Sequence, residues 1–155
     1  NFLYYIIMNQ NIWGSHLWFS LHTITFSYPN NPTNKDKEYY KNFFYSLQHV
    51  IPCSVCKKNY KRHLIEHPID DHLNSRKKIV YWLIDIHNMV NAEIGKKIYS
   101  YDVIIKKYEN VYNKSIELTD NPNVNKNYNY WNKYSIMIFL VIIILLIFII
   151  YFYRK

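Results

Sequence analysis

An uncharged run near the C-terminal end most constrains the fold of this chain. Residues 136–153, IMIFLVIIILLIFIIYFY, contain no charged side chain. As a helix they would be roughly 27 Å long, enough to cross the hydrocarbon core of a bilayer. A buried core helix is the alternative, but no other segment is long and apolar enough to surround so uniform a rod. We therefore predict a transmembrane helix over 136–153, with anchors at the far interface: Tyr151, Tyr153, Arg154 and Lys155.

The remainder of the 155-residue chain is long enough for one small domain. Basic residues flank the apolar run on both sides, so they set no orientation, but a terminal anchor favours a domain on the cytosolic side. Residues 1–10 lack a basic n-region and are a poor signal peptide, so we treat them as an extension in which Met8 is a candidate initiator. The net charge of +8 is spread over scattered lysines, so we expect no nucleic-acid partner.

Apolar residues recur at helical spacing in five segments, and no segment alternates as a strand does. We expect helices over 11–28, 36–50, 52–66, 75–94 and 101–112. Pro52 suits the entry of the third helix, which places Cys53 at or near a helix N-terminus, and Pro68 ends that helix. The pattern predicts an all-α domain over 11–112, a four-helix bundle plus a short fifth helix. The polar, Asn-rich stretch 113–135 reads as a flexible tether.

The two cysteines, Cys53 and Cys56, form a Cys-x-x-Cys motif that allows three interpretations. Together with His63 and His67 they formally make a zinc site. Only six residues separate Cys56 from His63, however, and a helix starting at Pro52 would hold all four ligands along one rod. A stapling disulfide would close too small a loop to remove much unfolded-state entropy.

The third interpretation is a redox centre, and the expected position of the cysteines on the helix supports it. The N-terminus of a helix stabilises a thiolate, and three cations of the same segment add positive charge: Lys57, Lys58 and Lys61. A dithiol that cycles must pass on two electrons, and the chain has no second cysteine pair to receive them. A bound cofactor is therefore the expected electron acceptor.

Polar and aromatic residues on two predicted helices suit such a cofactor. They are Trp13, Trp18 and His22 on the first helix, and His87, Asn88 and Asn91 on the long one. Each alone is more often a packing residue. Together they place polar groups on faces that should be apolar, where burial without partners would cost several kcal/mol. A shared bound partner would remove that cost.

Three motifs in this order resemble the Erv/ALR-type FAD-linked sulfhydryl oxidases: WGSHLWFSLHTITFSYP, IPCSVCKKNYKRHL and HNMVNAEIGKKIY. The family pattern is Trp-Gly-Arg, Trp-x-x-Leu-His, Tyr-Pro-Cys-x-x-Cys and His-Asn-x-Val-Asn-x-x-Leu-Gly-Lys, and the match covers residues 12–112. The resemblance implies a four-helix bundle with the isoalloxazine at its mouth, a fifth helix over the adenine side, and a homodimer.

The resemblance also implies an activity. Thiols of partner proteins would reduce the Cys53–Cys56 disulfide, and FAD would pass the electrons to molecular oxygen, giving hydrogen peroxide. Cys53 would be the exposed member that exchanges with substrate, and Cys56 the member that lies against the flavin and reacts with it. The implied FAD-binding residues are Gly14, Ser15, Trp18, His22, Tyr28, His87, Asn88, Val90, Asn91, Lys96, Lys107 and Tyr108.

The chain departs from the family pattern at several positions. Ser15 stands in place of an Arg, and Tyr108 and Tyr112 stand where Trp is usual. Ile65 and Tyr101 occupy the positions of a structural disulfide, and no shuttle cysteines exist. This minimal set with a membrane anchor resembles the oxidases of large cytoplasmic DNA viruses. It implies direct transfer from a thiol partner such as a small relay protein, disulfides in virion proteins, and a location in host cytoplasm or virion membrane.

Overall fold

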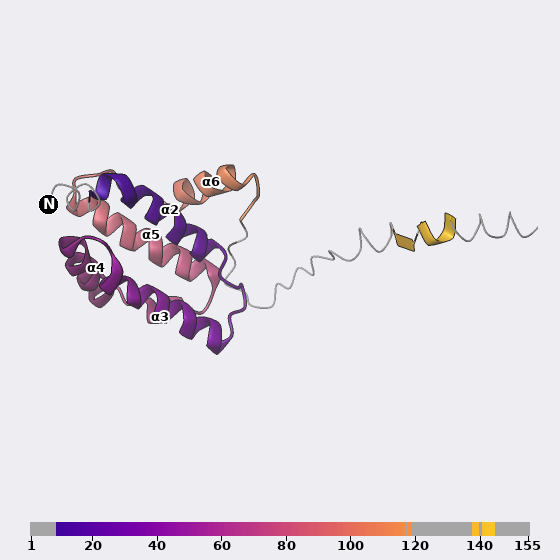
Figure 1. The fold of residues 1–155 in the computed structure, drawn as a ribbon, viewed down its shortest axis with the longest axis horizontal. Helices are drawn as coiled ribbons and strands as arrows, with labels where there is room; N and C mark the ends of the chain where they lie inside the picture. Colours follow the sequence, from indigo (N-terminus) through magenta and orange to yellow (C-terminus); the bar gives the residue numbers. More distant parts are fainter. Residues whose placement is uncertain (1–8, 117, 119–137, 140, 145–155) are drawn as a thin grey trace, which may run out of the picture. The chain divides into compact units, whose positions relative to one another are not determined.

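The computed structural model describes residues 9–116, 118, 138–139 and 141–144. The chain divides into two units, Asn1–Val124 and Asn125–Lys155. The labelled helices of Figure 1 lie in the first unit, and no strand occurs among the described residues. In the second unit, residues 138–139 and 141–144 are helical.

Three of the predicted segments fall largely on residues outside this description. They are the N-terminal extension, the tether from residue 119 onward, and most of the predicted membrane helix 136–153. Within the described ranges, no helix has both the length and the apolar character needed to cross a membrane. The boundaries of these segments stay predictions.

The described part of the first unit is all-helical, as predicted. Its elements are α2 (Gln10–Phe26), α3 (Asn34–Val50), α4 (Ser54–Glu66), the 3₁₀ helix η1 (Ile69–His72), α5 (Arg76–Glu93) and α6 (Tyr101–Tyr112). The five predicted helices are confirmed. The 3₁₀ turn η1 was not predicted, because four residues between Pro68 and Leu73 are too few to display a period.

Helix α3 begins two residues earlier than its apolar pattern indicates. Thr33 and Asp36 form a capping box: the Asp36 N–H donates to Thr33 Oγ1 at 3.1 Å, and the Thr33 N–H donates to Asp36 Oδ2 at 2.8 Å. This satisfies two otherwise unpaired donors and fixes the start of the helix. The Pro- and Asn-rich composition of the preceding loop hid this signal.

The ends of α4 and α5 follow the sequence signals. Cys53 is the N-cap of α4, which begins directly after Pro52 and Cys53, and Ser75 is the N-cap of α5, accepting from the Lys78 N–H. Gly95 follows α5 with φ +67°, a left-handed conformation that glycine adopts at little cost. The cap of α4 matters for function because it is one of the two cysteines.

The helices pack in pairs that set the position of the site. Helix α2 packs against α5, α3 packs against α4, and α6 and η1 pack against α5 (Figure 1). The α2–α5 pair brings His22 and His87 together, and the α3–α4 pair holds the segment that carries the cysteines.

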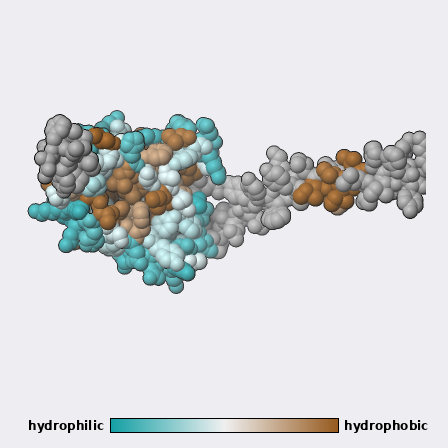
Figure 2. Space-filling model, in the orientation of Figure 1, coloured by the Kyte–Doolittle hydropathy of each residue, from teal (hydrophilic) through white to brown (hydrophobic). Residues whose placement is uncertain are grey.

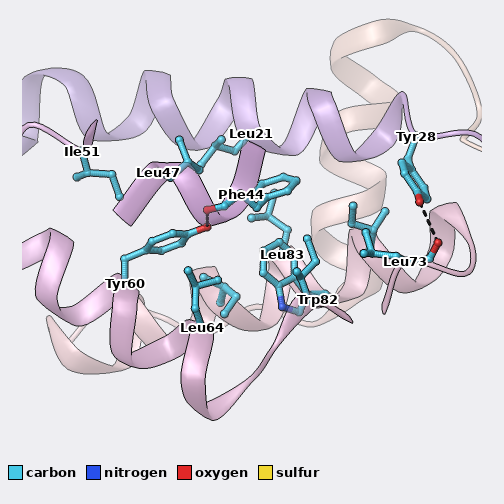
Figure 3. Packing of buried hydrophobic residues seen from close by; sticks show 13 residues of the cluster. Leu21, Tyr28, Phe44, Leu47, Ile51, Tyr60, Leu64, Leu73, Trp82 and Leu83 are labelled. Carbon is cyan, nitrogen blue, oxygen red and sulfur yellow. Dashed lines mark hydrogen bonds between the residues drawn. The ribbon is translucent and has the colours of Figure 1, made fainter. Parts of the chain in front are cut away.

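The core lies between these pairs and is rich in large side chains (Figure 3). Trp82 and Phe44 are fully buried with their rings 5.0 Å apart, edge to face. Two polar groups of the core have backbone partners: the Trp82 Nε1–H donates to the His67 carbonyl at 2.9 Å, and the Tyr60 hydroxyl donates to the Phe44 carbonyl at 3.1 Å. The core is therefore both densely packed and hydrogen-bonded, which gives the site a rigid support.

Candidate functional site: a helix-capping disulfide and a histidine–tryptophan cluster

The two cysteines are joined in a disulfide at the start of α4. The Cys56 backbone N–H donates to Cys53 Sγ at 3.1 Å, so Cys53 caps its own helix with sulfur. Both cysteines are partly buried against the core, while Ser54 and Val55 between them are exposed. Solvent thus reaches the motif through its two middle residues, and the helix N-terminus favours negative charge on sulfur when the bond is reduced.

A residue outside the recognised motifs also touches the disulfide. Cys56 Sγ lies 3.4 Å from Oε1 of Gln10, in the first turn of α2. A disulfide sulfur carries no proton, so this is a contact in the oxidised form and a possible hydrogen bond only after reduction. Sequence reasoning missed Gln10 because nothing in its spacing or type distinguishes it from a solvent-exposed amide.

Trp18, His22 and His87 form a cluster between α2 and α5. His22 Nε2 lies 3.0 Å from His87 Nδ1, and the Trp18 ring stacks on the His87 ring at 3.9 Å with an interplanar angle of 4°. The side chains come from one turn of α2 and from the middle of α5. The structure therefore brings these three predicted residues together, and their role in binding a cofactor stays a prediction.

Both histidines of the cluster are uncharged near neutral pH. Burial, together with His87 and Lys107, lowers the pKa of His22 to about 3. Burial, Lys107 and Lys96 lower the pKa of His87 to about 4. Since each neutral ring carries one N–H, one of the two rings donates and the other accepts in the hydrogen bond between His22 and His87.

These low pKa values predict a loss of stability in mild acid. An unfolded histidine binds a proton below about pH 6.5, whereas the folded rings resist protonation down to about pH 4. Above pH 6.5 the two rings therefore do not change the free energy of unfolding. As the pH drops from 6.5 toward 4, each histidine lowers that free energy by about 1.4 kcal/mol per pH unit. Urea unfolding at several pH values measures this slope. His87→Gln, which removes one titrating ring, should reduce it, and an unchanged slope would contradict the assignment.

Helix α6 closes the cluster from the side. Tyr108 is buried, with its ring centroid 5.3 Å from that of His22, 5.0 Å from Phe26 and 5.6 Å from Phe19. Burial also raises the pKa of its hydroxyl. Phe19, His22 and Phe26 lie at helical spacing on α2, a signal in the sequence that could have indicated this second aromatic contact.

Residues of the third motif mainly hold the connection between α5 and α6. The Asn88 side chain forms two bonds with Tyr99, donating from Nδ2 to the carbonyl at 2.8 Å and accepting from the N–H at 3.1 Å. The Asn91 carbonyl accepts from the Lys96 N–H at 2.7 Å, and the Val90 carbonyl accepts from the Ile94 N–H at 3.2 Å. This loop brings the Lys96 charge close enough to act on His87.

The structure does not bring every predicted residue to the cluster. Tyr28 is fully buried in the core, where its hydroxyl donates to the Leu73 carbonyl at 2.9 Å (Figure 3). Its ring also meets the Tyr40 ring edge to face. Ser15 is exposed on α2. The assignment of both residues to the cofactor stays a prediction.

The cluster suits a molecule with flat rings and negative phosphates, such as FAD. His22 Nδ1 is buried and has no hydrogen-bond partner among the described residues, and a bound polar group would remove the cost of that burial. A Cβ placed on Gly14 would meet no atom within 4 Å, so space is open beside the backbone of α2. Lys96 and Lys107 supply positive charge, and Trp18 and Tyr108 supply flat faces.

The zinc interpretation finds no support in this geometry. Both sulfurs are used in the disulfide, and His63 Nε2 lies 2.8 Å from Glu93 Oε1. His67 Nε2 lies 3.5 Å from Asp85 Oδ2. In the part of the chain that the structure describes, no three His, Cys, Asp or Glu side chains gather as a metal site would require. The predicted rod geometry of α4 explains this, because it separates the histidines from the cysteines.

Comparisons with known proteins agree with the site. The Erv1 / Alr family model matches residues 15–111. A probable FAD-linked sulfhydryl oxidase of Acanthamoeba polyphaga mimivirus is 39% identical over 125 residues, which cover 80% of this chain and 82% of that protein. An FAD-linked sulfhydryl oxidase of African swine fever virus is 32% identical over 104 residues, 67% of this chain and 82% of that protein.

A solved structure of a family member has a similar fold. The crystal structure of the FAD binding domain of Erv1 from Saccharomyces cerevisiae has a TM-score of 0.62 and 26% identity, and the match covers 66% of this chain and 95% of that one. The family model, the relatives and the fold converge on the helices that carry the disulfide and the histidine–tryptophan cluster. This chain belongs to the Erv1/Alr family.

Proposed function

We propose that this chain is an FAD-dependent thiol oxidase that forms disulfide bonds in partner proteins and delivers the electrons to molecular oxygen as hydrogen peroxide. The observation that carries the proposal is the Cys53–Cys56 disulfide at the N-terminus of α4, in a member of a family whose relatives are FAD-linked sulfhydryl oxidases. When bound, FAD supplies the acceptor for two electrons and the reactivity toward oxygen.

The chain's own residues carry out the thiol exchange. A substrate thiolate attacks Cys53 Sγ, a substrate–Cys53 bond forms, the Cys53–Cys56 bond breaks, and the electron pair goes to Cys56 Sγ. A second substrate thiolate then releases Cys53 and leaves the substrate with a disulfide. The cap geometry supports these roles, since the Cys56 N–H that meets Cys53 Sγ can stabilise the departing Cys53 thiolate in this second step.

The cofactor residues proposed for this chain are those at and around the cluster. Trp18, His87 and Tyr108 would stack against flat rings, His22 would bond a polar group, and Lys96 and Lys107 would face the phosphates. Asn88 would act by holding the α5–α6 connection in place. Neutral histidines keep the site free of two extra positive charges near the lysines.

The association of the protein with other molecules is also proposed. A homodimer is supported by large apolar side chains exposed on α2 and α6, namely Ile12, Phe19, Val103, Val111 and Tyr112. Figure 2 shows hydrophobic atoms gathered in the middle of one face of the domain with hydrophilic atoms around them. Sedimentation of the purified protein tests this state, and a monomer at micromolar concentration would contradict it.

The apolar C-terminal sequence supports a proposal for the cellular location. We infer that 136–153 anchors the protein in a membrane with the oxidase domain on the cytosolic side, in host cytoplasm or at a virion membrane, where it oxidises virion proteins directly or through a small thiol relay protein. Extraction of the protein by alkaline carbonate would contradict the anchor.

Visible absorption of the purified protein tests the oxidase function directly. We expect a flavin spectrum that bleaches when dithiothreitol is added without oxygen and recovers in air with release of hydrogen peroxide. A double Cys53→Ser, Cys56→Ser variant is the control, since it should keep the colour and lose the bleaching. A colourless protein carrying stoichiometric zinc would overturn the proposal in favour of a zinc-binding adaptor.

A further inference from the structure

The two sulfurs of the disulfide have different neighbours. Cys53 Sγ accepts the Cys56 backbone N–H at 3.1 Å, whereas Cys56 Sγ is in contact with Oε1 of the Gln10 side chain at 3.4 Å. Gln10 comes from α2, a different helix and a distant part of the sequence. A backbone N–H thus lies beside the sulfur of Cys53, and a side-chain amide lies beside the sulfur of Cys56.

This asymmetry matters because of which sulfur must leave. When a substrate thiolate attacks Cys53, the electron pair of the broken bond goes to Cys56, and a thiol with a lower pKa leaves faster. A donor beside Cys56 Sγ would therefore speed the exchange. Rotating the carboxamide of Gln10 by half a turn exchanges its oxygen and nitrogen, so an N–H can replace Oε1 beside the sulfur once it is negative.

Resting on the oxidase function proposed above, we propose that Gln10 is a positioning residue that donates a side-chain N–H to the Cys56 thiolate during disulfide exchange. Hydrogen bonds order the backbone at the start of α2: Asn9 Oδ1 accepts the Asn11 N–H at 3.0 Å, and the Asn9 carbonyl accepts the Ile12 N–H at 3.0 Å. The backbone of Gln10 therefore lies on a capped first turn.

The charges around Cys56 favour a thiolate and are the same in every variant of Gln10. Helix α4 contributes Lys57, Lys58 and Lys61, and neither α4 nor α2 has an acidic residue in its first turn. Any difference between variants at position 10 therefore reports the side chain of that residue.

The experiment measures the pH dependence of Cys56 alkylation by iodoacetamide in the full chain carrying Cys53→Ser. Gln10→Ala removes the donor, so the apparent pKa of Cys56 should rise by about half a unit to one unit. Gln10→Met keeps roughly the size of the side chain but has neither a donor nor a charge, so it should cause a similar rise. Asn11→Ala, at the exposed neighbouring amide, is the control and should cause no shift.

The apparent pKa values of Cys56 in the variants at position 10 show whether Gln10 forms a hydrogen bond or only packs against the sulfur. If Gln10 only fills space, the similarly sized Gln10→Met would match the unchanged residue and only Gln10→Ala would deviate, which would overturn the proposal. Equal pKa values in all variants would overturn it too. With both cysteines present, Gln10→Ala should slow the reduction of the disulfide by thiols about two- to fivefold.

Alkylation needs neither FAD nor oxygen, so this test is independent of the oxidase function. If the pKa of Cys56 rose as expected but the protein with both cysteines showed no turnover, the proposed oxidase function would be contradicted and the role of Gln10 would stand. If turnover were normal but the pKa of Cys56 did not change, the role of Gln10 would be contradicted and the oxidase function would stand.

Discussion

Cys56→Ser is expected to retain bound FAD and to lose thiol oxidase activity by about three orders of magnitude or more. The variant cannot form the Cys53–Cys56 bond, so a substrate thiolate finds no disulfide to attack. The fold should persist, because a disulfide across two intervening residues removes little unfolded-state entropy and the Cys56 N–H that meets the cap belongs to the backbone. Oxygen consumption with dithiothreitol measures the activity, and the ratio of flavin to protein absorbance measures cofactor retention.

The matched control is Ser54→Ala, which lies between the cysteines on the exposed side of the motif. It should keep both the disulfide and the turnover. If Cys56→Ser retained turnover, Cys56 would not be the sulfur that passes electrons to the flavin. If it lost FAD as well as activity, the residue would be part of the cofactor pocket and the loss of activity would not report on exchange.

The helical architecture could be predicted from the sequence because its signals are local. Pro52, Pro68 and Gly95 mark helix ends, and the apolar period between them is strong, so the five described α-helices of the first unit all begin and end within two residues of expectation. The earlier start of α3 depended on the pair Thr33 and Asp36, a short-range signal masked by loop-like composition. Local pattern thus gave the elements but not every boundary.

The site could be predicted only in part, because residues meet in it through packing that no local pattern encodes. The cluster of Trp18, His22 and His87 was predictable, since polar residues on two apolar faces require a common partner. Tyr28 shows the limit: a motif position suggests a cofactor contact, yet the ring is buried beside Tyr40 in the core. Gln10 shows the opposite case, a contact to Cys56 that exists only because the starts of two helices meet.

Cys53→Ser should likewise abolish turnover, and it should also give a signal that Cys56→Ser lacks. With Cys53 removed, Cys56 remains as a free thiol, which its proposed role puts next to the flavin, and the N-terminus of α4 with its nearby lysines favours the thiolate. A thiolate against oxidised flavin absorbs at long wavelength by charge transfer. We therefore expect a new absorption band in Cys53→Ser that grows with pH as Cys56 ionises, and no such band in Cys56→Ser.

The cap position makes serine the correct replacement for Cys53. Cys53 Sγ accepts the Cys56 N–H, and a serine oxygen is among the best acceptors at an N-cap, so α4 should stay formed. Cys53→Ala lacks the acceptor and should lower the free energy of unfolding by about 1 kcal/mol relative to Cys53→Ser. A charge-transfer band in Cys56→Ser and none in Cys53→Ser would mean that Cys53, and not Cys56, is the sulfur next to the flavin. Equal stability of the serine and alanine variants would instead show that the side-chain cap at position 53 contributes nothing to the stability of α4.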